Sequence, residues 1–169
     1  MKKPTFREVF EQELPFVYNS LRRMGIRAAD LPDVTQEVFA TVASVLADYD
    51  PTRPLRPWLF GIAYRVGLRY ADVAHRRREV PAEVPEVPDS TPGADVAIER
   101  REARDLARAA LETIEPNRRA VLVLSHLEGL SAPEIAEALQ IPVNTAYSRL
   151  NRARQEFADA ARRLGWRET

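Results

Sequence analysis

The chain of 169 residues contains no cysteine and only two histidines, His75 and His126. The absence of cysteine excludes disulfides, thiolate metal sites and cysteine redox switches. Two histidines are too few for a histidine-based zinc cluster, so we expect both to be plain surface or boundary residues. The sequence therefore predicts no metal and no other cofactor.

Long apolar runs are also missing. No stretch approaches the ~18 apolar residues of a membrane span. Met1, Lys2 and Lys3 are not followed by the apolar core of a signal peptide. We therefore expect a cytoplasmic protein with no membrane insertion. The sequence also lacks a nucleophile–base pair and a phosphate-binding loop, so we expect it not to be an enzyme.

Charge is balanced overall but unevenly distributed. Residues 1–80 hold 13 basic and 10 acidic side chains, residues 81–99 hold five acids and no base, and residues 100–169 hold 12 basic and 10 acidic side chains. Within the acidic strip, residues 81–95 contain four prolines, a glycine and four acids. Such a segment has no apolar face to bury and predicts an extended or disordered linker. We expect it to join two domains, residues 1–80 and 96–169.

Apolar residues recur at helical spacing through both blocks, and no useful stretch alternates with period two. The fold class is therefore predicted to be all-α. Pro15 should bend or split the first helix, Asp30 can cap the second, and three prolines in residues 50–57 predict a stiff basic loop. The helices predicted before the C-terminal motif cover residues 5–24, 31–49, 57–79, 96–114 and 118–127.

The stretch from Ser131 to Phe157 predicts two helices joined by a tight turn. Ser131 and Glu134 form a capping box at the start of the first helix, and Pro142 prevents that helix from continuing. The second helix has an apolar face at helical spacing, made by Ala146, Leu150, Ala153 and Phe157. This arrangement is typical of a helix-turn-helix.

The other face of the second helix is polar and basic. Its side chains can hydrogen-bond base edges and pair with phosphates, as a recognition helix does in the major groove. An ordinary helical hairpin with a solvated basic face is the alternative; the agreement of cap, turn and polar face favours DNA binding. The candidate residues are Asn144, Thr145, Tyr147, Ser148, Arg149, Asn151, Arg152 and Arg154.

Two sets of segments resemble a known family. The segment Asp33–Phe39, and Trp58–Ala63 with an arginine run behind it, resemble conserved region 2 of bacterial RNA polymerase sigma factors. The segments Glu128–Ala136 and Ile141–Arg154 resemble region 4. The two regions occur in this order and are joined by a short linker, an arrangement that resembles extracytoplasmic-function (ECF) sigma factors. The resemblance implies a protein that directs core RNA polymerase to promoters and helps open the −10 region.

The resemblance also implies partners and sites. Region 4 would read the −35 element of promoter DNA, and an anti-sigma factor would hold the protein inactive. Asp33, Gln36 and Glu37 would meet the polymerase, although a solvated helix face is the alternative. Trp58 is expected to be a core residue that supports the base-capturing loop. The residues expected to contact −10 DNA are Arg53, Arg56, Arg65, Arg69, Arg76 and Arg77.

The chain departs from the family at three positions. Arg65 and Arg69 stand where the family often has asparagine and aspartate, and Tyr147 stands where a basic residue is common. We therefore expect an unusual −10 and −35 preference. Two other functions stay open at this point: a helix-turn-helix regulator that does not act through core polymerase, and an adaptor that has kept the fold without promoter recognition.

Overall fold

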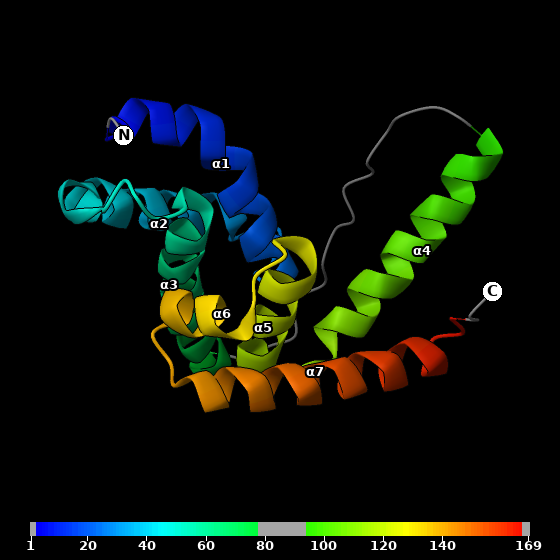
Figure 1. Ribbon diagram of the computed structural model, residues 1–169. Helices are drawn as coiled ribbons and strands as arrows, with labels where there is room; N and C mark the ends of the chain where they lie inside the picture. Colours follow the sequence, from blue (N-terminus) through cyan, green and yellow to red (C-terminus); the bar gives the residue numbers. More distant parts are fainter. Residues whose placement is uncertain (1–2, 78–93, 167–169) are drawn as a thin grey trace.

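The computed structural model describes residues 3–77 and 94–166. Their secondary structure is helical, with no strand in either range, so the predicted all-α class is confirmed. Figure 1 shows helices of both halves of the chain packed side by side. The elements are α1 (Phe6–Arg23), α2 (Leu31–Val45), η1 (Leu46–Asp48), α3 (Leu55–Arg77), α4 (Ala94–Glu112), α5 (Pro116–Leu127), α6 (Ala132–Leu139) and α7 (Val143–Arg163).

Helix α1 is a single helix that contains Pro15 in its interior. Its first turn is held by Thr5, whose backbone N–H donates to the Glu8 carboxylate at 2.7 Å. Figure 1 shows that α1 changes direction partway along its length. Proline removes one backbone hydrogen bond and bends a helix, so the expected bend is present and the alternative of a split helix is not.

Asp30 lies at the N-cap position of α2, but its carboxylate makes no cap hydrogen bond, contrary to our expectation. It accepts instead from Arg27 Nε at 2.7 Å and from the hydroxyl of Tyr70 on α3. Both hydrogen bonds are charge-assisted, and the one from Arg27 is also an ion pair. Asp30 therefore ties the loop before α2 to α3.

The loop after η1 is shorter than predicted, because α3 already begins at Leu55. Pro57 falls in the first turn of α3, where its missing N–H would have had no helical partner, so three residues of the predicted loop are helical. Asp50 holds the remaining turn by accepting from the backbone N–H of Thr52 at 2.9 Å.

Most of the predicted linker, residues 81–95, lies outside the described residues; Ala94 and Asp95 already belong to α4. Helix α5 begins two residues earlier than predicted. Glu115 caps it by accepting from the backbone N–H of Asn117 at 3.0 Å and of Arg118 at 3.3 Å. The turn expected over residues 115–117 therefore lies earlier, at 113–115, and Glu115 is the cap of α5.

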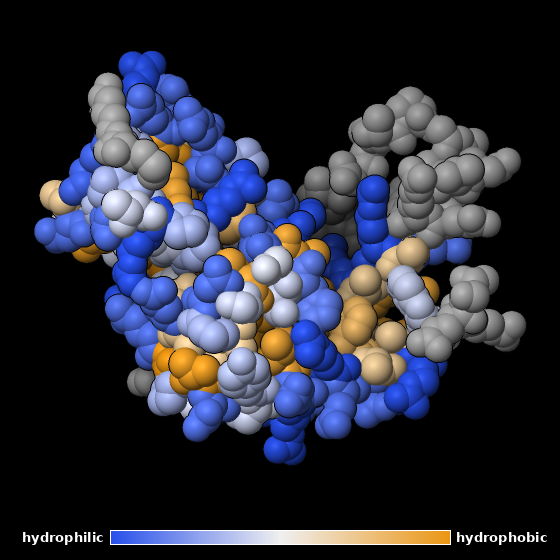
Figure 2. Space-filling view, viewed as in Figure 1, coloured by the Kyte–Doolittle hydropathy of each residue, from blue (hydrophilic) through white to orange (hydrophobic). Residues whose placement is uncertain are grey.

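The two halves of the chain share one continuous hydrophobic core. Helix α3 packs on α5 and α6 as well as on α1 and α2. The core includes Val38 and Phe60 from the first half and Leu124 and Ile135 from the second, all at most 2% exposed. A smaller apolar cluster, centred on Ala110 and Ala160, joins α4 to α7, and Figure 2 shows hydrophobic residues gathered in the angle between these helices.

Candidate nucleic-acid interface

Helix α6 and the turn that follows set the direction of α7. The Glu134 carboxylate accepts from the backbone N–H and the hydroxyl of Ser131 at 2.8 and 2.5 Å, which confirms this link of the predicted capping box. These hydrogen bonds lower the pKa of Glu134. Gln140 ends α6 in the left-handed region at φ 56°, and Pro142 leads directly into α7. The predicted helix-turn-helix is therefore present.

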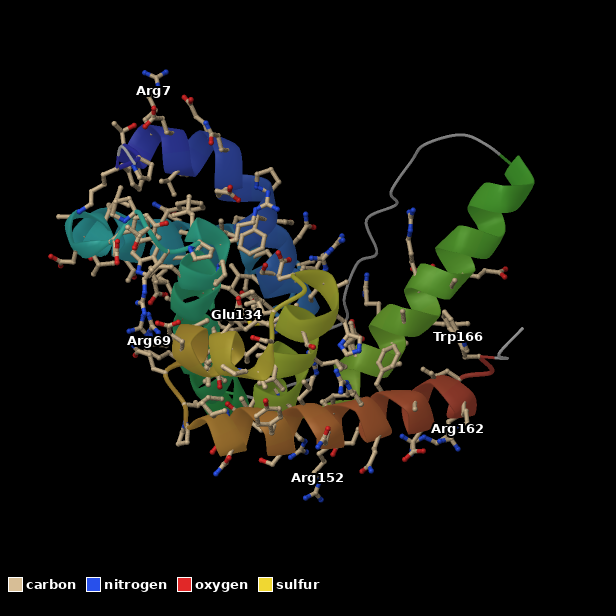
Figure 3. The ribbon with its side chains drawn as sticks, in the orientation of Figure 1. Arg7, Arg69, Glu134, Arg152, Arg162 and Trp166 are labelled. Atoms are coloured by element: carbon tan, nitrogen blue, oxygen red, sulfur yellow. The ribbon has the colours of Figure 1, made fainter. Side chains whose placement is uncertain are left out.

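One face of α7 is buried against α5 and α6 through Ala146, Leu150 and Ala153. The opposite face carries most of the candidate −35 residues at the surface. Figure 3 shows Arg152 on the outer side of α7, pointing away from the molecule. The exposed candidates are Asn144, Tyr147, Ser148, Asn151, Arg152 and Arg154.

Arg149 and Thr145 differ from the other candidates on α7 because both are half-buried. Nη1 of Arg149 is fully buried, and this side chain lies close to Tyr64 of α3. Burial raises the pKa of Tyr64, and the positive charge of Arg149 opposes that rise. The guanidinium of Arg149 therefore faces the other half of the chain, while its neighbours on α7 face solvent.

Two candidate arginines are paired: Arg53 in the loop before α3 and Arg56 in the first turn of α3. Arg53 forms an ion pair with Glu137 of α6. Arg56 Nε lies 2.9 Å from a Glu13 carboxylate oxygen, and its guanidinium lies 5.2 Å from the centre of the Phe16 ring. Arginine over an aromatic face gains cation–π attraction. Both side chains are held by protein partners in this conformation.

Trp58 is half-buried and packs on Tyr49, with ring centroids 4.8 Å apart. The hydroxyl of Tyr49 donates to the backbone carbonyl of Arg53 at 2.5 Å. The indole of Trp58, which was predicted to lie in the core, therefore packs against the core while staying half-buried, and it contacts the loop through Tyr49.

Arg65 and Arg69 lie exposed on α3 one helical turn apart. Although Arg65 is exposed as a whole, partial desolvation of its guanidinium and the nearby charge of Arg69 lower its pKa. Arg69 Nη2 donates to a carboxylate oxygen of Glu37 at 3.0 Å. Two predicted sites, one for DNA and one for polymerase, therefore meet through this ion pair. Arg76 and Arg77 end α3, and their side chains lie outside the described residues.

Asp33, Gln36 and Glu37 form an exposed face of α2, opposite the buried side chains of Val34 and Val38. This face and the arginines of α3 are neighbours, since α2 packs directly on α3. In Figure 3, Arg69 lies beside α3, well separated from Arg152 on α7. Arg69 therefore joins the candidate polymerase residues on α2, whereas Arg152 lies on a separate surface of α7.

Arg119 is a residue that the sequence reasoning missed. It is 6% exposed and donates to the backbone carbonyls of Met24, Glu112 and Ile114 at 2.8 to 2.9 Å. One signal was available: Arg119 shares a helix face with Val123, one turn further along α5. An arginine on an apolar face has to find buried acceptors.

Within residues 3–77 and 94–166, no cluster of histidine and acidic side chains could hold a metal ion. No helix in these ranges has the length and hydrophobicity needed to cross a membrane.

Known proteins match both halves of the chain. The family model described as Sigma-70 region 2 matches residues 9–78, and the one described as Sigma-70, region 4 matches residues 104–157. The ECF RNA polymerase sigma factor SigE of Mycolicibacterium smegmatis is 33% identical over 162 residues, covering 92% of this chain and 61% of SigE. The chain thus spans about three fifths of the length of SigE.

A second relative is matched over most of its length. The RNA polymerase sigma factor CnrH of Cupriavidus metallidurans is 33% identical over 151 residues, covering 81% of this chain and 76% of CnrH.

Solved structures agree with these sequence matches. CnrH in complex with the cytosolic domain of CnrY has a TM-score of 0.62 at 27% identity, covering 91% of this chain and 85% of CnrH. The sigma factor RpoE in complex with the anti-sigma factor NepR from Bartonella quintana shares the fold, with a TM-score of 0.71 at 18% identity, and covers 93% of this chain and 96% of RpoE. By its two matched regions and its relatives, the chain belongs to the sigma-70 family of RNA polymerase sigma factors, in the ECF group.

Proposed function

We propose that this chain binds core RNA polymerase, directs it to specific promoters and helps to open the −10 region. One observation carries the proposal: a capped helix-turn-helix presents an exposed polar face on α7, in a chain whose other half matches region 2. A recognition helix alone would suit any DNA-binding regulator. The added region 2 match favours a subunit that works with polymerase over a regulator that does not.

The proposed roles divide among three surfaces. The outer face of α7, which includes Asn151 and Arg152, reads the −35 element. The arginines of α3 and of the loop before it, such as Arg56 and Arg65, hold −10 DNA. The exposed face of α2 that ends at Glu37 binds polymerase. No catalytic step is assigned to the chain, because binding energy alone brings polymerase to the promoter and opens the duplex.

The proposal also divides the chain into two domains. Residues 1–80 bind polymerase and −10 DNA, and residues 96–169 bind −35 DNA. The basic residues in both blocks support this division. Core polymerase and promoter DNA are the expected partners, and both place the protein in the cytoplasm.

An anti-sigma factor is a further proposed partner. RpoE was solved with the anti-sigma factor NepR, and CnrH was solved with the cytosolic domain of CnrY. In this chain a cleft of about 1050 Å³ runs between the two halves. Its lining combines the apolar side chains of Ile26 and Leu68 with the basic groups of Arg27, Arg108 and Arg118. Glu112, Glu115 and Glu156 line the cleft as well and pair with Arg108 and Arg118, so the lining suits an amphipathic segment of mixed charge.

Run-off transcription with purified core polymerase on a randomised promoter library tests the function. We expect transcripts from a defined subset of promoters, and only when the chain is added. Substituting Asp33, Gln36 and Glu37 together by alanine should abolish these transcripts while duplex binding by the helix-turn-helix persists. Transcripts that do not depend on the chain, despite retained duplex binding, would favour a regulator that does not act through core polymerase.

A further inference from the structure

The start of α7 exposes two apolar side chains on the helix proposed to read −35 DNA. Val143, the first residue of α7, is 43% exposed, and Tyr147, one turn later, is 51% exposed. Residues four apart lie on the same face of a helix, so the two side chains are neighbours. Figure 2 shows hydrophobic residues at the surface where α7 begins. Single exposed apolar residues are common, but these two adjoin in the segment that a recognition helix presents to bases.

The packing of the chain does not account for this pair. Helix α7 packs on α5 and α6 through a different face, made by Ala146, Leu150 and Ala153. Neither valine nor tyrosine is a strong helix former, so helix stability does not account for them either. Val143 and Tyr147 are therefore available to a ligand of the outer face.

The turn before α7 fixes the position of the pair relative to α6. Gln140 ends α6 at φ 56°, and Pro142 is the N-cap of α7, with its carbonyl oxygen accepting from the backbone N–H of Ala146 at 3.1 Å. Valine is branched at Cβ and has few χ1 rotamers, and tyrosine has only two χ angles. The pair is thus a rigid apolar surface that loses little side-chain entropy on binding.

The hydrogen-bond donors of the same turns are largely engaged. The hydroxyl of Ser148 donates to the backbone carbonyl of Thr145 at 3.1 Å. Arg149 is the only arginine among residues 143–149, and its guanidinium faces Tyr64 of α3. Arginine is the side chain that specifies guanine best, through two hydrogen bonds to the base edge. The first two turns of α7 therefore offer no outward guanidinium for reading guanine.

Apolar side chains in the major groove recognise a different base. Thymine presents a 5-methyl group there, and apolar contact with this methyl is a form of direct readout. The methyl groups of Val143 and the ring of Tyr147 provide such contact. Burying one methyl group changes an affinity about fourfold, so the effect is large enough to measure.

We propose that Val143 and Tyr147 form an apolar reading pair that selects thymine, through its 5-methyl group, at one or two adjacent base pairs of the −35 element. This inference rests on the proposed function, in which α7 reads −35 DNA. A basic side chain at the position of Tyr147, as is common in the family, would favour guanine instead. Asn151 follows Tyr147 by one turn, so a base pair read by hydrogen bonds adjoins the thymine.

Deoxyuridine tests the methyl group alone. The full chain with core polymerase first selects its preferred −35 sequence from randomised promoter duplexes. Each thymine of that element is then replaced in turn by deoxyuridine, which lacks only the methyl group. We expect one or two replacements to weaken binding about fourfold and the others to have no effect. If no replacement changes the affinity, the inference is overturned and the −35 reading stands; if no −35 sequence is preferred at all, both the inference and the proposed function are overturned.

Substitutions assign the methyl contact to the two side chains. Val143→Ala and Tyr147→Ala should each bind the thymine and deoxyuridine duplexes equally at one sensitive position. Tyr147→Phe should keep the difference, because the ring and not the hydroxyl makes the contact. The matched control is Leu164→Ala, which shortens a 41% exposed apolar side chain at the other end of α7, about 30 Å away, and should also keep the difference. A difference that survives both alanine substitutions contradicts the assignment.

A gain of specificity completes the test. Tyr147→Arg should shift the preference at its base pair from thymine to guanine by about tenfold, because the guanidinium can donate to both acceptors of guanine. The affinities for all four bases at that position, measured with the original chain and the variant, give the shift. An unchanged thymine preference in Tyr147→Arg would show that this position does not contact the base.

Discussion

Two neighbouring side chains on α7 have different expected roles on −35 DNA. Asn151 can hydrogen-bond a base edge, whereas Arg152 is suited to phosphate. Asn151→Ala should therefore cost roughly 1–3 kcal/mol on the preferred sequence and relax preference at one or two base pairs. Arg152→Ala should weaken binding to every sequence and lower the salt slope by about one. Binding to single-base −35 variants at two salt concentrations measures both effects.

The opposite pattern would refute these roles: uniform weakening from Asn151→Ala together with altered preference from Arg152→Ala. Arg149 differs from Asn151 and Arg152, because its guanidinium lies against Tyr64 of α3 instead of facing solvent. Arg149 was predicted to contact DNA because it lies on the polar face of the helix. Its contact with a residue 85 positions earlier depends on how the halves pack, which helical periodicity does not encode.

Arg119 is expected to be the most important polar side chain for stability. Arg119→Ala would leave three carbonyl oxygens, those of Met24, Glu112 and Ile114, without this donor. Unsatisfied buried acceptors are costly, so the free energy of unfolding should fall by roughly 2–4 kcal/mol. Urea denaturation measures the loss.

The neighbouring residue Arg118 is the matched control for that experiment. It is partly exposed and pairs with Glu115 and Glu156 at the surface. Arg118→Ala should cost roughly 0–1 kcal/mol, the usual range for exposed ion pairs. Equal losses for the two variants would show that the hydrogen bonds of Arg119 are not the main source of its contribution.

At the scale of elements, local signals at the helix ends predicted the α-helices, although the helix expected over 31–49 ends at Val45 and continues as the 3-10 helix η1. Ser131 and Glu134 identify the start of α6, and Pro142 marks the turn before α7. The sequence-based expectations are wrong where one residue type can serve two structural roles. Proline ends helices but also suits their first turn, as at Pro57. Aspartate caps helices, yet Asp30 has tertiary partners that only the fold brings near.

The tertiary role of Asp30 predicts a pH effect. Its pKa is lowered in the folded chain, first by the hydrogen bond from Tyr70 and then by Arg27. The stabilisation is therefore fully present above the unfolded pKa of about 3.9, and it is lost as pH falls through the lower folded pKa. Asp30→Asn should reduce the free energy of unfolding by about 1 kcal/mol at pH 7, with the difference shrinking below about pH 4.

Denaturation of both proteins from pH 7 to pH 3 measures this difference. Asp159→Asn is the control, because that carboxylate lies at the surface of α7 beside Arg162 and should matter by less than about 0.5 kcal/mol at any pH. A stability difference for Asp30→Asn that stays constant down to pH 3 would mean that its ionisation is not responsible.

At the scale of the whole molecule, the sequence did not predict that the two halves pack together. The proline-rich acidic segment suggested independent domains. The contact depends on small residues, Gly61 on α3 and Ala138 on α6, and such residues carry no periodic apolar signal. Neither Gly25 nor Arg119 predicts this contact from the sequence, because the backbone at Gly25 and the guanidinium of Arg119 meet only after both halves fold. The exposure of the candidate residues on α2 and on most of α7 could be predicted from the sequence, but the packing of the two halves could not.

The contacts that join the two halves of the chain, between α3 and α6 and around Arg119, predict how this packing responds to salt. The pair of Arg53 and Glu137 is about half exposed, so it is screened by salt and contributes little. Apolar burial and the Arg119 hydrogen bond to Met24 lie in the interior, where screening is weak. The radius of gyration from small-angle scattering should therefore be the same in 0.1 M and 1 M NaCl, values chosen to span about 10 to 3 Å in Debye length. Duplex DNA binding should fall steeply over that range, because phosphate contacts release counterions. Expansion of the chain at high salt would instead assign this packing to its surface ion pairs, and Glu137→Gln should then expand it at low salt.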